Sequence, residues 1–157
     1  MRAQVQILLV LLLVGGCGDS PTGPVDPEEL SFAPALGVDL TQMTRTGTGL
    51  YIQDEVVGSG AEAVAGATVT VHYTGWFHHG APLDSSRDPG RTAFTFGPLG
   101  SAAVIAGWNQ GVQGMREGGH RLLVIPYQLA YGPTGRPGVP PYATLVFRIE
   151  MLSVGAN

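Results

Sequence analysis

The side chains that could do chemistry do not fall into the common catalytic patterns. The chain has four histidines, and the neighbouring pair His78 and His79 lacks the i, i+4 spacing of a helical zinc site. No G-x-S-x-G elbow, P-loop or helix-opening G-x-G-x-x-G offers a serine nucleophile or a phosphate-binding loop. Cys17 is the only cysteine and has no partner for a disulfide within the chain. We expect no covalent catalyst, no metal site and no cofactor.

Two polar residues and a set of aromatic residues remain as candidates. Asp84 precedes two serines and Tyr131 precedes a glycine, so each could simply mark a turn or a loop. Phe94, Trp108 and Phe147 lie at periodic apolar positions, which are typical of a core. Any function of these residues depends on how the fold groups them.

The elements that must position these residues are mostly strands. Val69, Val71 and Tyr73 alternate with polar residues, a pattern typical of a strand with one buried face. Similar runs predict strands over residues 50–57, 94–96, 122–125 and 145–151.

One segment has a helical period. Trp108, Val112 and Met115 are spaced i, i+4, i+7, which predicts a helix over residues 106–115 that is closed by two glycines. The expected fold class is therefore α+β, with a curved antiparallel sheet wrapped on one short helix.

The first residues are typical of a targeting segment. Arg2 precedes an unbroken apolar run at residues 7–14, which is too short to span a bilayer. Residues 14–17 resemble a bacterial lipobox, so we expect residues 1–16 to be a signal peptide and Cys17 to carry lipid. An ordinary cleaved secretion signal and an uncleaved start remain alternatives. Gly18 after the cysteine is similar to outer-membrane lipoproteins, so we expect an envelope location facing the periplasm, the outer membrane favoured over the inner.

Residues 17–48 differ in composition from the rest. Residues 18–24 are small, polar and rich in glycine and proline, which is typical of a flexible tether. The apolar residues Leu30, Phe32 and Leu36 could nevertheless pack against the domain. Both alternatives remain open. The net charge of -4, with eight scattered arginines and no lysine, makes nucleic acid an unlikely partner.

Six segments between residues 50 and 154 resemble, in order and in spacing, the signatures of the FKBP family of peptidyl-prolyl cis-trans isomerases. They are residues 69–75 (VTVHYTG), 84–88 (DSSRD), 94–96 (FTF), 104–108 (VIAGW), 129–132 (LAYG) and 143–147 (ATLVF). The resemblance implies that residues 49–157 form one such domain, a half-barrel sheet over a short helix. Between them it implies a shallow apolar pocket that receives a prolyl ring.

The resemblance also implies roles for individual residues. Trp108 is expected as the pocket floor, Asp84 as a buried carboxylate at its edge, and the Ile105 N–H and the Tyr131 hydroxyl as hydrogen-bond donors. The loop at residues 132–142, here called the flap loop, is expected to overhang the site. The remaining expected wall residues are Tyr73, Leu83, Phe94, Val104, Val139 and Phe147.

Two residues depart from the family pattern. Leu83 stands where an aromatic residue is frequent, and Tyr127 stands where bacterial relatives often have a second proline. Leu83 keeps the wall apolar but makes it smaller. The affinity for macrolides such as FK506 or rapamycin and the preferred residue before proline therefore stay open.

The expected function is isomerisation of X-Pro bonds in exported polypeptides, through a non-covalent site that stabilises a twisted amide. Expected partners are proline-containing polypeptides, FK506-like macrolides and, through the lipid anchor, a membrane. The alternative is a module on the same fold that binds prolyl segments or acts as a chaperone without useful turnover.

Overall fold

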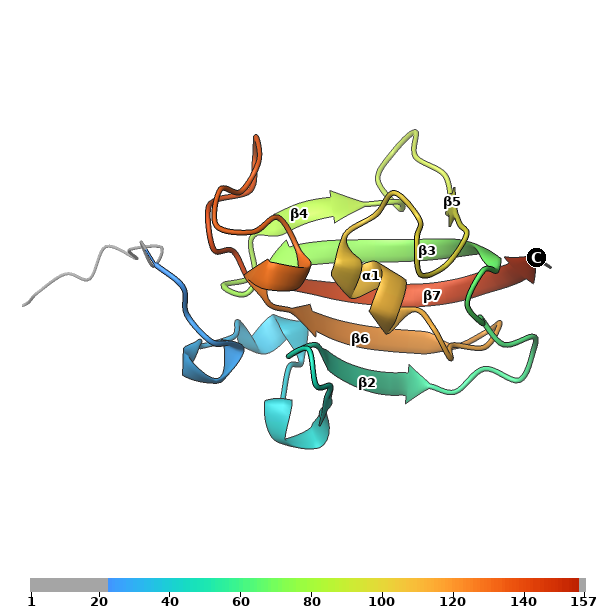
Figure 1. The fold of residues 1–157 in the computed structure, drawn as a ribbon, viewed down its shortest axis with the longest axis horizontal. Helices are drawn as coiled ribbons and strands as arrows, with labels where there is room; N and C mark the ends of the chain where they lie inside the picture. Colours follow the sequence, from blue (N-terminus) through green and yellow to red (C-terminus); the bar gives the residue numbers. More distant parts are fainter. Residues whose placement is uncertain (1–22, 156–157) are drawn as a thin grey trace, which may run out of the picture.

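The computed structural model describes residues 23–155, which form one antiparallel sheet with a short helix on its concave face (Figure 1). The sheet order is β1-β2-β6-β7-β3-β4, and β5 pairs with β3. The strands are β1 (Thr44–Arg45), β2 (Tyr51–Val56), β3 (Thr68–Phe77), β4 (Pro82–Ser85), β5 (Phe94–Phe96), β6 (His120–Ile125) and β7 (Leu145–Gly155). The helix is α1 (Ala106–Gly111), and the 3₁₀ helices are η1 (Pro27–Glu29), η2 (Pro34–Leu36), η3 (Leu40–Gln42) and η4 (Tyr127–Leu129). The expected α+β class is confirmed.

The main core lies between the sheet and α1. Val69, Val71 and Tyr73 all point into it from β3, as the period of two predicts. α1 packs very close to β6, because an added Cβ at Gly107 would lie 2.4 Å from the Ile125 Cγ2 atom. This closeness places Trp108 directly over the centre of the sheet.

The prediction of a helix over residues 106–115 is wrong at its end. α1 stops at Gly111, and the chain turns at Gly114 with a φ of +79°. Arg121 donates from Nη1 to the Gly111 and Gln113 carbonyls at 2.8 and 2.9 Å, so these oxygens need no further helical turn. Val112 and Met115 are buried even though they lie beyond the helix.

Two strands were not predicted. β1 has only two residues, both exposed, and β4 begins with a proline and continues into the Asp84-Ser85 pair. Neither segment has a repeating apolar pattern, so hydrophobic period gives no signal for them. Their backbones pair with β2 and β3, respectively.

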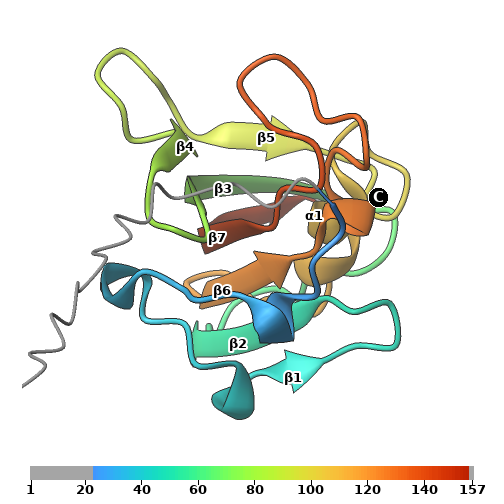
Figure 2. The same ribbon diagram turned by 90° about the vertical axis from the view of Figure 1, so that its left-hand side faces the viewer.

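Residues 24–43, here called the strap, pack against the convex side of the sheet. Leu36 and Met43 are buried there against Tyr51, Leu122 and other apolar residues of the strands. In Figure 2 the strap, drawn in blue, crosses β6 and reaches the side of the sheet away from α1. Of the two alternatives for this segment, a flexible tether and packing against the domain, the structure shows packing for the strap. The sheet begins at Thr44, which precedes the domain boundary expected at residue 49.

Cys17 and the expected signal peptide lie outside the described residues. The longest helix within residues 23–155 is α1, whose 6 residues are far too few to span a bilayer.

Candidate active site

A hollow of about 320 Å³ opens between α1, the inner face of the sheet and the flap loop. The walls come from β3, β4, β5, β7, the loop before α1 and the segment after η4, so that distant parts of the chain meet there. The residues that line the hollow are Tyr73, Leu83, Asp84, Arg91, Phe94, Ala103, Val104, Ile105, Trp108, Tyr131, Arg136 and Phe147.

Aromatic rings surround Trp108 at the bottom of the hollow. Its ring centroid lies 4.9 Å from that of Tyr73 and 5.3 Å from that of Phe147, both in edge-to-face contact. The indole Nε1 atom is buried, and no described residue accepts a hydrogen bond from it. Apart from this N–H group, the floor offers an aromatic, apolar surface to a ligand.

A glycine makes room for one wall of the hollow. Gly75 on β3 faces Phe147 on β7, and an added Cβ would lie only 2.4 Å from the Phe147 Cε1 atom. Any side chain at this position would displace the ring. The glycine that ends the VHYTG segment thus has a steric role at the site.

A hydrogen-bonded group of Tyr73, Asp84 and Arg91 closes one edge of the hollow. The Tyr73 hydroxyl donates to the Asp84 Oδ2 atom at 2.6 Å, and the Arg91 Nη2 atom lies 3.1 Å from Asp84 Oδ1. Burial, followed by this hydrogen bond and the charge of Asp84, raises the pKa of Tyr73 to about 12. The Asp84 side chain is 36% exposed, so it is less buried than the sequence suggested.

The two serines after Asp84 fix the strand that carries it. The Ser86 hydroxyl accepts from the Tyr73 N–H at 2.9 Å, and the Ser85 hydroxyl donates to the Tyr73 carbonyl at 3.1 Å. These bonds hold β4 against β3 beyond the backbone pairing. Asp84 is therefore placed by its neighbours in sequence rather than by its own contacts alone.

Besides the indole N–H of Trp108 and the guanidinium of Arg136, two further groups at the hollow have no acceptor among residues 23–155. They are the Ile105 backbone N–H and the Tyr131 hydroxyl. Asn109 fixes the loop before Ile105, because its side chain accepts from the Gly100 and Ala102 N–H groups and donates to the Ala102 carbonyl at 2.9 Å. Both donors are thus available to a bound molecule.

The structure brings together every expected pocket residue except Val139. Val139, which belongs to the flap loop, is 4% exposed, and it packs into the main core rather than lining the hollow. The lining also includes Ala103, Arg91 and Arg136, for which the sequence analysis predicted no role. Arg91 lies between the family segments at residues 84–88 and 94–96 and belongs to neither, and Arg136 offers no pattern beyond its place in the flap loop.

No group of three or more His, Cys, Asp or Glu side chains in the described part of the chain is arranged to hold a metal ion. His78 and His79 instead contact each other and nearby rings at the turn after β3.

Comparisons with known proteins agree with this geometry. Residues 60–152 match the family model described as FKBP-type peptidyl-prolyl cis-trans isomerase. An FK506-binding protein of Neisseria meningitidis serogroup B is 50% identical over 107 residues, which cover 68% of this chain and 96% of that protein.

Two solved structures are similar in fold and in sequence. FkpA from Escherichia coli has a TM-score of 0.66 and 38% identity, with 73% of this chain and 52% of that chain covered, so this chain spans about half of that structure. AtFKBP13 has a TM-score of 0.64 and 38% identity, with 71% and 97% covered. The resemblance seen in the sequence is confirmed: the chain belongs to the FKBP-type peptidyl-prolyl cis-trans isomerase family.

Proposed function

We propose that this protein isomerises X-Pro bonds of exported polypeptides by seating the prolyl ring on Trp108 and stabilising a twisted amide. The single observation that carries the mechanism is the aromatic hollow, in which Trp108 lies at the floor and the unpaired Ile105 N–H and Tyr131 hydroxyl lie at the wall.

Isomerisation requires no bond to be made or broken. The barrier is about 18 to 20 kcal/mol because rotation removes amide resonance, and uncatalysed X-Pro exchange takes tens to hundreds of seconds. The planar amide is more polar than the twisted one. A water-poor site therefore disfavours the planar state relative to the transition state, and that difference raises the rate.

The polar groups at the rim are suited to orientation rather than to proton transfer. The Ile105 N–H and the Tyr131 hydroxyl can donate to backbone carbonyls on either side of the proline. Asp84 is already engaged by the Tyr73 hydroxyl and by Arg91. Its role in this proposal is to set the shape and polarity of the edge.

We also propose that the same hollow accepts FK506-like macrolides, which the names of the relatives attribute to those proteins. Leu83 supplies a smaller wall than an aromatic residue, so such ligands would lose some contact area there.

The location is part of the proposal. The apolar run before Cys17 and the small residues next to it support a lipid-anchored envelope protein facing the periplasm, with Gly18 favouring the outer membrane. A slow X-Pro step can limit folding of exported chains, and an anchored isomerase would accelerate it.

Cis-to-trans relaxation of short X-Pro peptides, with Leu, Phe, Ala or Glu before proline, tests the activity. The Cys17→Ser chain, which cannot be lipidated, should raise the relaxation rate in proportion to its concentration, and Trp108→Leu should lose most of the effect. Saturable peptide binding with relaxation at its spontaneous rate would instead establish the non-catalytic binding module.

A further inference from the structure

The charges around the hollow do not balance. The chain has a net charge of -4, yet two arginines, Arg91 and Arg136, line the hollow together with only one carboxylate, Asp84. Arg91 pairs with that carboxylate at 3.1 Å. No ion pair within residues 23–155 involves Arg136. One positive charge at the hollow is therefore left without an anionic partner.

The backbone of Arg136 is held in place by a tight turn. Its N–H donates to the Val139 carbonyl at 2.9 Å, and the Val139 N–H donates back to the Arg136 carbonyl at 2.8 Å. Pro137 and Gly138, the latter with a φ of +82°, occupy the central positions that a type II turn requires. Val139 is buried in the core, so the turn that carries the exposed Arg136 is anchored at this end.

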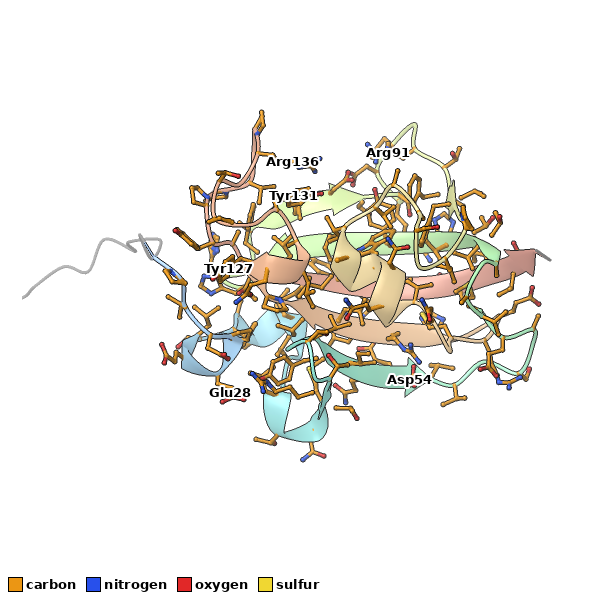
Figure 3. All side chains as sticks on the ribbon, in the orientation of Figure 1. Glu28, Asp54, Arg91, Tyr127, Tyr131 and Arg136 are labelled. Atoms are coloured by element: carbon orange, nitrogen blue, oxygen red, sulfur yellow. The ribbon has the colours of Figure 1, made fainter. Side chains whose placement is uncertain are left out.

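The side chain of Arg136 is also held in place. Its Cζ atom lies 4.2 Å from the centroid of the Tyr131 ring, which is a cation–π contact. Figure 3 shows Tyr131, Arg136 and Arg91 at one edge of the molecule, opposite Glu28 and Asp54. Stacking uses the face of the guanidinium and leaves its N–H groups, which lie in the plane, able to bind an anion.

We propose that Arg136 is a specificity-determining residue that favours substrates with Asp or Glu adjacent to the proline. A carboxylate at that point of the substrate can accept paired hydrogen bonds from the guanidinium while the prolyl ring lies on Trp108. This inference rests on the proposed isomerase function and adds a class of substrate to it.

The test compares peptides that differ only in charge. Relaxation is measured for Glu-Pro against Gln-Pro, and for Pro-Glu against Pro-Gln, with the full Cys17→Ser chain as the parent protein. Variants are Arg136→Gln, Arg136→Lys and, as a matched control, Arg116→Gln. Arg116 pairs with Glu62 and does not line the hollow. The quantity compared is the ratio of kcat/KM for the Glu peptide to kcat/KM for the Gln peptide. If a variant disturbs Tyr131 and so lowers the activity on both peptides equally, this ratio does not change.

In the parent protein the ratio should favour Glu by about two- to fivefold in at least one pair at about 0.01 M salt, as for an exposed ion pair. It should fall to about one in Arg136→Gln and at about 1 M salt, persist in part in Arg136→Lys, and stay unchanged in Arg116→Gln. A ratio near one in the parent protein, or a preference that survives Arg136→Gln, would overturn the inference. Gln peptides report separately on the isomerase function, because a failure to accelerate any peptide would remove that function itself.

Discussion

Tyr131 lines the hollow, and its hydroxyl has no acceptor among residues 23–155. Removing this hydroxyl should therefore weaken the binding and turnover of substrate without lowering the stability of the fold. We predict that Tyr131→Phe lowers kcat/KM on X-Pro peptides by about three- to tenfold, the effect of losing one hydrogen bond. The ring that stacks against Arg136 remains. The measurement is peptide relaxation together with urea unfolding, in which the midpoint should not change.

Tyr142→Phe is the matched control for that experiment. Tyr142 contacts Tyr127 by its ring at 5.1 Å and does not line the hollow. Its hydroxyl can be removed without touching the proposed site. Equal activity of Tyr131→Phe and the parent protein would show that this hydroxyl does not orient substrate.

Tyr73 should make the stability of the protein depend on alkaline pH. Its pKa is raised to about 12, whereas in the unfolded chain it is about 10. Between these values the unfolded state binds fewer protons than the folded state. The contribution of Tyr73 to the free energy of unfolding is therefore fully present below about pH 10 and is lost as the pH rises towards 12. Burial and, after it, the hydrogen bond to Glu28 raise the pKa of Tyr51 to about 12. Tyr51 therefore contributes in the same direction.

Urea unfolding at several pH values between about 9 and about 12 measures this effect, and the chain has no lysine to titrate in that range. Tyr73→Phe should show a shallower decline of unfolding free energy than the parent protein, and Tyr51→Phe/Tyr73→Phe the shallowest. Parallel curves for all three proteins would contradict the prediction.

At the scale of elements, the sequence predicted the features that depend on hydrophobic periodicity and on family motifs. The long strands and the burial of Trp108 follow from alternation and helical spacing, and the family signatures identified most of the hollow. The end of α1 did not follow, because Arg121 caps it from a distant strand. The place of Arg136 at the hollow could not be predicted either. It results from the turn at residues 136–139 and from the contact of the guanidinium with the Tyr131 ring, and both form only in the folded chain.

The strap shows the same limit and gives a prediction at this scale. The strap contains several turn-forming residues, yet Leu36 is only 4% exposed. The packing of such apolar side chains against the sheet therefore determines the conformation of the strap. We predict that Leu36→Ala lowers the free energy of unfolding by about 2 to 4 kcal/mol through the cavity it leaves. The active hollow lies on the other face of the sheet, so kcat/KM of the folded protein should stay the same.

Leu152→Ala is the control for that prediction. Leu152 is 39% exposed, so the same change should cost less than about 1 kcal/mol. If Leu36→Ala were no more destabilising than Leu152→Ala, the strap would not be an integral part of the folded domain.

At the scale of the whole molecule, the strap connects the proposed anchor to the end that carries the flap loop. Val25 and Leu30 share a small hollow with Pro140, Pro141 and Tyr142 from the end of that loop. The chain therefore enters the domain next to the flap loop. A lipid on Cys17 would tie this end of the domain, rather than the far end, to the membrane.

The packed strap also shortens the tether. Only residues 18–23 separate Cys17 from the strap, and the extended chain from Cys17 to Pro24 reaches at most about 25 Å. The lipidated protein should therefore hold its domain close to a vesicle surface, and energy transfer from a fluorophore on the domain to acceptors in the headgroups should be strong. Inserting about 20 Gly and Ser residues after Gly23 should weaken the transfer, because the average reach grows with the square root of length.

Cys17→Ser should leave the protein in solution. Transfer that is unchanged by the insert would show that the domain lies on the membrane through contacts of its own, and membrane association of Cys17→Ser would remove the lipid from the explanation.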